Sequence, residues 1–356
     1  TIRLAFLFII NGYGQKIDFT GYKHLSGKVD KEDIITFDLV IIGDQIIGYY
    51  NNFNYGKTIS LELSGEIYQN NIVVNIAESE QTIFSGEIID SKHILGTWNS
   101  IDKGIPYSTM LEEIYNEGSI RMDNQYISDQ HKLLPINNSP IALFQCNMIN
   151  PTLELATSSS IRNILLSQFF DTKSEAYNPE AIIAELKANF FAYYQQINID
   201  NYTDANYTKY NWMKQKLMSV RYNEDYILTV KLHNYAYTGG SFGTGISQYV
   251  VMDSRNGKRV KLNDIFKGEF GPKLKGLIND KFRSKYKIPK ERKLSEAGMF
   301  VDEIPLKDNF YINKTGIGFH FNVYEIATPD YGIIDIFIPF DELQQTLKED
   351  GIISWR

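Results

Sequence analysis

The N-terminal part of the chain is built from short stretches in which apolar and more polar residues alternate one by one. Phe37, Leu39 and Ile41 belong to one such stretch, and residues 58–64 form another. A repeat of two places alternate side chains on opposite faces, which is typical of a β-strand with one buried face. Brief polar breaks separate the stretches. The pattern predicts an antiparallel meander that curls or closes into a barrel-like β domain over residues 15–120.

A weak internal repeat places a glycine inside several of these expected strands. Leu25–Val29, Leu63–Ile67 and Phe84–Ile88 share one order: apolar residue, Ser, Gly, charged residue, apolar residue. Residues 46–50 and 94–98 are looser relatives. The uneven spacing argues against a solenoid. A glycine within a strand marks a bulge or a sharp bend, so we expect these five glycines to supply the curvature of the domain.

The rest of the chain changes character after a polar segment. Residues 121–140 are rich in turn formers and predict a linker. Residues 141–356 then mix helix signals with strand patterns, and a helix is expected to begin at Asn178-Pro179. Strands are expected near 213–222, 226–237, 246–253, 316–326 and 333–338. Helices together with antiparallel strands predict an α+β fold.

The first residues indicate export. Leu4–Ile10 is an uninterrupted apolar run that is too short to span a bilayer, and Gly12 and Gly14 supply small residues for a cleavage site. We interpret residues 1–14 as the remnant of a signal peptide, with a buried N-terminal strand as the alternative. The expected location is therefore periplasmic or secreted. No later segment is apolar enough to predict a stable membrane span.

Composition narrows the classes of ligand and chemistry. A formal net charge of −7 argues against nucleic acid and anionic lipid, which require a basic surface. The five histidines show no metal-ligand spacing, and the single Cys146 offers neither a CxxC motif nor a disulfide. Gly239–Gly243 fits the GxSxG pattern of serine hydrolases, but a strand-like segment follows it where the helix of a nucleophile elbow would be needed, so Ser241 is not expected to be a nucleophile. We therefore expect no metal and no cofactor, and catalysis is less expected than binding.

A glycine-rich loop at Thr238–Gly245 offers a possible phosphate site. It lacks the Gly-Lys-Ser/Thr ending of a P-loop, and a strand-like segment follows it where a helix would be needed. A wide turn that requires glycine at several positions is the better interpretation. The loop follows an aromatic strand, so Thr238, Gly239 and Gly240 remain candidate binding residues beside that strand.

Two expected strands carry polar and aromatic side chains on one face. His233, Tyr235 and Tyr237 alternate on the first, and His320, Asn322 and Tyr324 alternate on the second. If the two faces lie side by side, they form a patch suited to a sugar or a protein surface. A solvated sheet face or the cover of a helix is the alternative. The candidate ligand-binding residues are His233, Tyr235, Tyr237, Thr238, Gly239, Gly240, His320, Asn322 and Tyr324.

Several of these motifs resemble one bacterial family. Tyr235–Gly240, Asp253, Gly257-Lys258, Leu262 and Ile265-Phe266, together with Tyr324–Ala327, Tyr331-Gly332 and Ile338–Phe340, carry the resemblance. The family is the extracytoplasmic domain shared by the RsiV anti-sigma factor and the peptidoglycan deacetylase PdaC, and the match spans roughly 140–356. Residues 15–120 look like a β-domain that precedes it in exported proteins of the Bacteroidetes type. Ser241-Phe242 stands where the family usually has a small residue and a histidine.

The resemblance implies a binding or sensor module that faces the cell envelope and recognises a peptidoglycan-related glycan or a protein such as lysozyme. The metal-binding residues of the separate deacetylase domain are absent from this sequence. Two alternatives remain open. One is a cell-wall glycan hydrolase or deacetylase-like enzyme with His233 or His320 as general base. The other is a small-ligand carrier that uses a cavity inside the N-terminal β domain.

Overall fold

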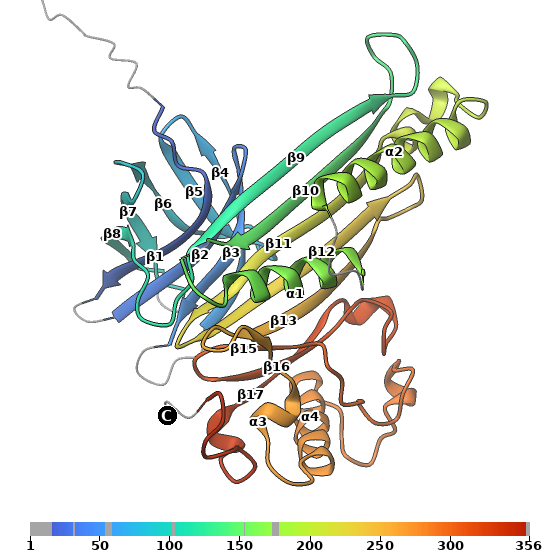
Figure 1. Ribbon diagram of the computed structural model, residues 1–356. Helices are drawn as coiled ribbons and strands as arrows, with labels where there is room; N and C mark the ends of the chain where they lie inside the picture. Colours follow the sequence, from blue (N-terminus) through green and yellow to red (C-terminus); the bar gives the residue numbers. More distant parts are fainter. Residues whose placement is uncertain are drawn as a thin grey trace, which may run out of the picture.

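The computed structural model describes residues 16–30, 33–53, 59–101, 104–152, 154–172 and 178–353. Three sheets organise the chain: a closed eight-stranded barrel, a six-stranded sheet and a three-stranded sheet (Figure 1). Helices pack against the second and third sheets. The expected α+β fold, with an antiparallel barrel-like domain at the N-terminal end, is confirmed. The expected signal-peptide remnant at 1–14 lies outside the described residues.

The barrel is a simple meander in which each strand pairs antiparallel with its neighbour and the first pairs with the last. Its strands are β1 (Gly21–Val29), β2 (Asp33–Ile42), β3 (Gln45–Asn52), β4 (Ile59–Tyr68), β5 (Asn71–Ile76), β6 (Thr82–Ile88), β7 (His93–Asn99) and β8 (Pro106–Glu113). The alternation recognised in the sequence places apolar side chains inside. Phe37, Tyr50, Phe84 and Trp98 lie in ring contact there. This filled interior argues against the small-ligand carrier.

Four of the five glycines of the repeat lie directly against the backbone of a neighbouring barrel strand, and Gly27 lies against the Leu111 side chain, whose Cδ2 would be 2.6 Å from a Cβ. A Cβ on Gly48 would lie 2.0 Å from the backbone oxygen of Asp38. At Gly65, Gly86 and Gly96 the nearest atom is likewise a backbone oxygen of the adjacent strand, within 2.5 Å. Real Cβ contacts are never this short, so a side chain would push the strands apart. The glycines therefore permit the tight curvature of the barrel.

The six-stranded sheet has the order β14-β13-β12-β11-β10-β9 and is antiparallel except for the β10–β11 pair. Its strands are β9 (Met122–Lys132), β10 (Ile141–Pro151), β11 (Trp212–Glu224), β12 (Ile227–Tyr237), β13 (Thr244–Asp253) and β14 (Lys258–Arg259). The sequence suggested a linker at 121–140, but β9 occupies most of it. An edge strand borders solvent and has little apolar alternation, which explains why the polar composition was misleading.

Two helices cover one face of this sheet: α1 (Ser158–Phe170) and α2 (Pro179–Asn198). The expected helix start is confirmed, since the Asn178 side chain accepts hydrogen bonds from the backbone N–H groups of Glu180 and Ala181. Apolar residues of both helices pack on the central strands. Phe190 of α2, for example, lies beside Trp212 at the start of β11.

The three-stranded sheet consists of β15 (Phe310–Ile312), β16 (Gly316–Phe321) and β17 (Ile334–Pro339) and packs against helix α4 (Gly271–Tyr286). The remaining helices are α3 (Leu262–Ile265) and the short 3-10 helices η1 (Asp204–Tyr210), η2 (Ser295–Ala297), η3 (Pro329–Tyr331) and η4 (Phe340–Glu342). The chain after β17 forms only one short turn of helix, η4. None of the described helices is long and apolar enough to cross a membrane.

One buried arginine joins the three sheets. Arg221 stands at a bulge in β11, and its guanidinium lies 4.9, 5.4 and 3.5 Å from the ring centroids of Tyr49, Tyr249 and Tyr311. These rings belong to β3, β13 and β15 respectively. Arg221 also donates to the Tyr249 hydroxyl at 2.9 Å. Cation–π attraction in a desolvated site stabilises this junction.

A second buried polar cluster fixes the barrel to the six-stranded sheet. His24 Nδ1 lies 2.7 Å from Asp38 Oδ1, and Nε2 lies 3.5 Å from Glu224 Oε1 at the end of β11. Burial lowers the pKa of His24, but the two carboxylates outweigh it and raise the pKa to about 10. The imidazole is thus a cation held between two acids. Tyr22 donates to the same Asp38 carboxylate at 2.6 Å.

Candidate functional site

The expected strand face on β12 is present. His233, Tyr235 and Tyr237 alternate along one side of the strand and are all half-buried. In the register with β11 they lie opposite Leu217, Gln215 and Met213. Lys231, on the same face, is covered by the barrel and pairs with Glu62 at 2.6 Å. The barrel therefore covers one end of the face and leaves the aromatic end accessible.

His233 is a neutral, half-buried side chain. Its Nδ1 lies 2.9 Å from Ser247 Oγ on the neighbouring strand β13. Burial and, to a smaller extent, the positive charge of Lys231 lower the pKa of His233 to about 4. His233 is consequently uncharged at neutral pH.

The second expected face is interrupted. The sequence suggested a strand over 316–326, but β16 ends at Phe321 and residues 322–325 form a turn. The backbone N–H of Glu325 donates to the backbone carbonyl of Asn322 at 3.1 Å, and this hydrogen bond closes the turn. Tyr324 adopts a φ of +65° and is 52% exposed. It therefore does not continue the row that His320 begins.

His320 and Asn322 are occupied by contacts within the protein. His320 is buried, with Nδ1 2.9 Å from Asp335 Oδ1 and Nε2 3.3 Å from Asn322 Oδ1. The Asn322 side chain accepts from the backbone N–H of Ser247 at 2.6 Å and donates to its carbonyl at 3.2 Å. Both predicted faces thus meet at Ser247, because His233 contacts the side chain of the same residue. The contacts around Ser247 therefore join the three-stranded sheet to the six-stranded sheet.

These contacts weaken the hydrolase alternative. A general base needs a ring nitrogen that can reach the substrate. Both nitrogens of the buried His320 already have partners, and His233 uses one nitrogen for Ser247. Across the described ranges, no group of three or more His, Cys, Asp or Glu side chains could hold a metal ion.

The glycine-rich loop forms the turn between β12 and β13, as expected. Gly239 has a φ of +87°, and a Cβ there would lie 2.5 Å from the Lys209 carbonyl oxygen and 3.1 Å from Trp212 Nε1. A Cβ on Gly243 would lie 2.2 Å from the Tyr235 hydroxyl oxygen. Glycine at these two positions lets the loop pack onto Trp212 and Tyr235. Phe242 at the tip of the loop is 70% exposed.

A pocket of about 390 Å³ lies beside the accessible end of the β12 face. We call it the aromatic pocket. Tyr235 and Tyr237 line it together with two further aromatic side chains, Tyr207 of η1 and Trp212 of β11. The remaining lining residues are Ser139, Ile141, Leu143, Asn211 and Met213. Among the described residues, the buried Trp212 Nε1 has no hydrogen-bond partner.

Tyr207, Trp212, Ser139 and Asn211 were not among the predicted site residues. They come from two segments, one at Ser139 and one at 207–212, that only the fold brings together, and short contacts hold these segments in place. The backbone N–H of Ile141 donates to the Asn211 side chain at 3.0 Å, and the Tyr207 hydroxyl donates to the Ser139 carbonyl at 3.3 Å. The one local signal was the aromatic sequence around Tyr207, Tyr210 and Trp212 just before an expected strand.

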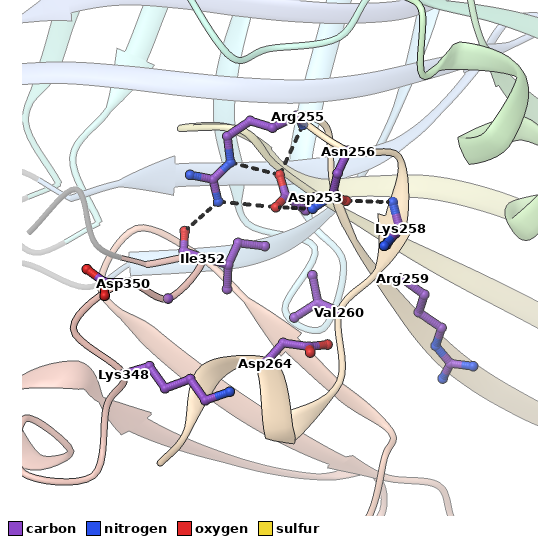
Figure 2. Close-up of a pocket in the computed structure, with 11 residues that line it drawn as sticks. Asp253, Arg255, Asn256, Lys258, Arg259, Val260, Asp264, Lys348, Asp350 and Ile352 are labelled. Carbon is purple, nitrogen blue, oxygen red and sulfur yellow. Dashed lines mark hydrogen bonds and ion pairs between the residues drawn. The ribbon is translucent and has the colours of Figure 1, made fainter.

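A different cleft, of about 520 Å³, lies between the β13–β14 turn and the C-terminal segment (Figure 2). Arg255 there makes a two-pronged contact with Asp253, at 2.9 and 3.2 Å, and donates to the Ile352 carbonyl. Arg259 donates to Gln168 of α1. The two arginines are therefore engaged in holding the C-terminal segment and α1 to the sheet, which is a structural role.

The fold and the site together define an α+β protein with an N-terminal β-barrel and an aromatic pocket at one end of a mixed sheet. Residues 263–341 match a protein family described as "Protein of unknown function (DUF3298)". This range contains α4 and the three-stranded sheet. No curated protein matches the chain.

Two solved structures of the same family are similar to the chain. A DUF3298 family member from Bacteroides fragilis superposes with a TM-score of 0.57 and 22% identity, covering 67% of this chain and 98% of that one. A DUF3298 family protein from Pseudomonas aeruginosa gives a TM-score of 0.48 and 13% identity, covering 65% of this chain and 96% of that one. At this identity, the first similarity shows a shared fold.

Proposed function

We propose that the chain is an exported, non-catalytic binding module of the cell envelope that recognises a peptidoglycan-related glycan through the aromatic pocket. The observation that supports this most strongly is the gathering of Tyr207, Trp212, Tyr235 and Tyr237 around one cavity. Its volume of about 390 Å³ is in the range of small-molecule sites. Two of these residues, Tyr235 and Tyr237, were expected from the sequence.

The chemistry of the pocket suits a sugar. Aromatic rings provide flat apolar surfaces for the C–H face of a pyranose, and tyrosine hydroxyls can bond its oxygens. Trp212 contributes its ring to the lining, because its Nε1 atom is buried and lies against Gly239 of the loop.

A protein such as lysozyme is the competing ligand. A stable protein partner commonly buries about 800 Å² on each side and uses a broad surface. The aromatic pocket is concave and is bordered by the connections 133–140 and 238–243, which favours a small or linear ligand. We therefore place the glycan first and treat lysozyme binding as an outcome that the experiment can detect.

The proposed periplasmic or secreted location rests on two features of the sequence. One is the signal-like composition of residues 1–14. The other is the resemblance of the motifs around Tyr235–Gly240 and Ile338–Phe340 to the RsiV/PdaC-type extracytoplasmic domain. Peptidoglycan lies in that compartment, so the location and the proposed ligand support each other.

A sedimentation assay with insoluble peptidoglycan tests the proposal. The intact protein should sediment with the polymer, and the double variant Tyr235→Ala/Tyr237→Ala should lose most of this binding. Tyr68→Ala is a matched control, because Tyr68 is 74% exposed on β4 of the barrel. Failure of the intact protein to sediment would overturn the proposal. Binding to immobilised lysozyme with no binding to peptidoglycan would replace the glycan by a protein ligand.

A further inference from the structure

The outer wall of the barrel carries a groove of about 740 Å³ that shares no residue with the aromatic pocket. Outward-facing residues of β8, β1 and β2 form its floor, among them Met110, Lys28 and Thr36. The β11–β12 turn and the segment 114–117 also line it. We call it the barrel groove.

Large apolar side chains are exposed along this wall. Met110 is 52% exposed and Ile34 is 46% exposed, and both line the barrel groove. Leu95 of β7, 47% exposed, is the register partner of Met110. Single exposed apolar residues are ordinary, but neighbouring ones beside a groove mark a surface that interacts with a partner.

The charge of the barrel groove defines which partner it fits. Among the described residues, its lining includes four carboxylates, those of Glu112, Glu117, Glu224 and Asp225, and two lysines, Lys28 and Lys314. Glu224 is paired with the buried His24, so the other three carboxylates give the groove its acidic character. The side chain of Glu112, two residues after Met110 on the same face of β8, is 52% exposed. An acidic groove with apolar contacts complements a basic and partly apolar ligand, and it disfavours nucleic acid and anionic lipid.

We propose that the barrel groove binds an extended segment of a partner protein in which apolar residues alternate with Lys or Arg. In an extended segment, alternate side chains point to opposite sides. One side can then rest on Met110 and Ile34 while the other directs its cations toward the acidic walls. This site is distinct from the proposed glycan site and would let the chain connect a partner protein to the envelope polymer.

Fluorescence anisotropy on the full chain tests this proposal. The probe is a fluorescein-labelled peptide of alternating Lys and Val, about eight residues long to match the length of a barrel strand. We expect saturable binding that weakens about tenfold in Met110→Lys, because that change removes an apolar contact and adds a like charge. Tyr68→Lys, on an exposed site outside the barrel groove, should leave the affinity unchanged.

The controls separate this site from the aromatic pocket. The double variant Tyr235→Ala/Tyr237→Ala should bind the basic peptide with the affinity of the parent, whether or not it has lost its binding to peptidoglycan. A peptide of alternating Glu and Val should not bind. The proposal is overturned by three results: no saturable binding of the basic peptide, equal affinity for parent and Met110→Lys, or equal binding of the acidic peptide.

Discussion

The side-chain amide of Asn322 binds the backbone of Ser247 as a neighbouring strand would. It accepts from the N–H at 2.6 Å and donates to the carbonyl at 3.2 Å. Asn309 extends the pattern, accepting from the N–H of Tyr249 at 2.8 Å and donating to the Ser247 carbonyl at 2.9 Å. Two asparagines therefore satisfy the free edge of β13 and attach the three-stranded sheet to it.

Asn322→Ala should destabilise this attachment. The substitution leaves the N–H of Ser247, a 2% exposed residue, without its partner, which costs about 1–3 kcal/mol. Asn263→Ala, on the exposed surface of α3, should change the free energy of unfolding by less than about 0.5 kcal/mol. Urea denaturation followed by circular dichroism measures both. Equal stability of Asn322→Ala and the parent would show that the amide pair does not hold the sheets together.

The buried imidazolium of His24 predicts a dependence of stability on pH. Its pKa is about 10 in the folded chain and about 6.5 when unfolded, so the folded state retains a proton that the unfolded state loses. The protonated His24 therefore contributes its full stabilisation below pH 6.5. As the pH rises toward 10 this contribution is lost, and the free energy of unfolding falls by up to about 1.4 kcal/mol per pH unit. Thermal unfolding between pH 6.5 and 9 should show this decline, and His24→Gln should flatten it.

Gly243→Ala tests the link between the loop and the pocket. The added Cβ would meet the Tyr235 hydroxyl oxygen at 2.2 Å, so Tyr235 must move and ligand affinity should fall about tenfold. Gly240→Ala is the matched control, since Gly240, although a candidate from the sequence, does not line the aromatic pocket and its Cβ would meet nothing closer than 3.8 Å. Sedimentation with peptidoglycan compares the two variants. If they bind alike, the position of Tyr235 does not control recognition.

Gly48→Ala tests the account of barrel curvature. Its Cβ would meet the Asp38 carbonyl oxygen at 2.0 Å, and relieving that contact should cost about 3 kcal/mol of stability. Gly276→Ala in α4 has no atom within 4 Å of the new Cβ and should stabilise by up to about 1 kcal/mol. Both variants replace Gly by Ala, so any difference between them reflects the surroundings of the two glycines. In chemical denaturation, the midpoint of Gly48→Ala should fall and that of Gly276→Ala should rise.

The sequence predicted the parts of this structure that depend on local patterns. Alternation around Phe37 gave the barrel strands, and Asn178-Pro179 gave the start of α2, because each signal lies within a few neighbouring residues. Strand β9 was missed because its edge position leaves it polar. The end of β16 was also missed, since Asn322 turns away to bind Ser247, a residue that is distant in the sequence.

The residues of the candidate site also fall into those that a local pattern predicted and those that only the fold reveals. Tyr235 and Tyr237 were predicted from alternation within one strand. Trp212 and Tyr207 were not, because they reach the aromatic pocket only through the packing of α2 and η1 on the sheet. Because the pocket is assembled from segments that are distant in the sequence, no regular spacing of residues could predict it.

The most direct test of the account is the indole N–H resonance of Trp212 in a ¹H–¹⁵N spectrum. The chain has 3 Trp residues, so Trp212→Phe assigns the signal by its disappearance. On addition of soluble peptidoglycan fragments, the account predicts a saturable shift of the Trp212 resonance, while that of Trp98 inside the barrel stays in place. An unchanged Trp212 resonance at saturating ligand would contradict the proposal that the aromatic pocket binds the glycan.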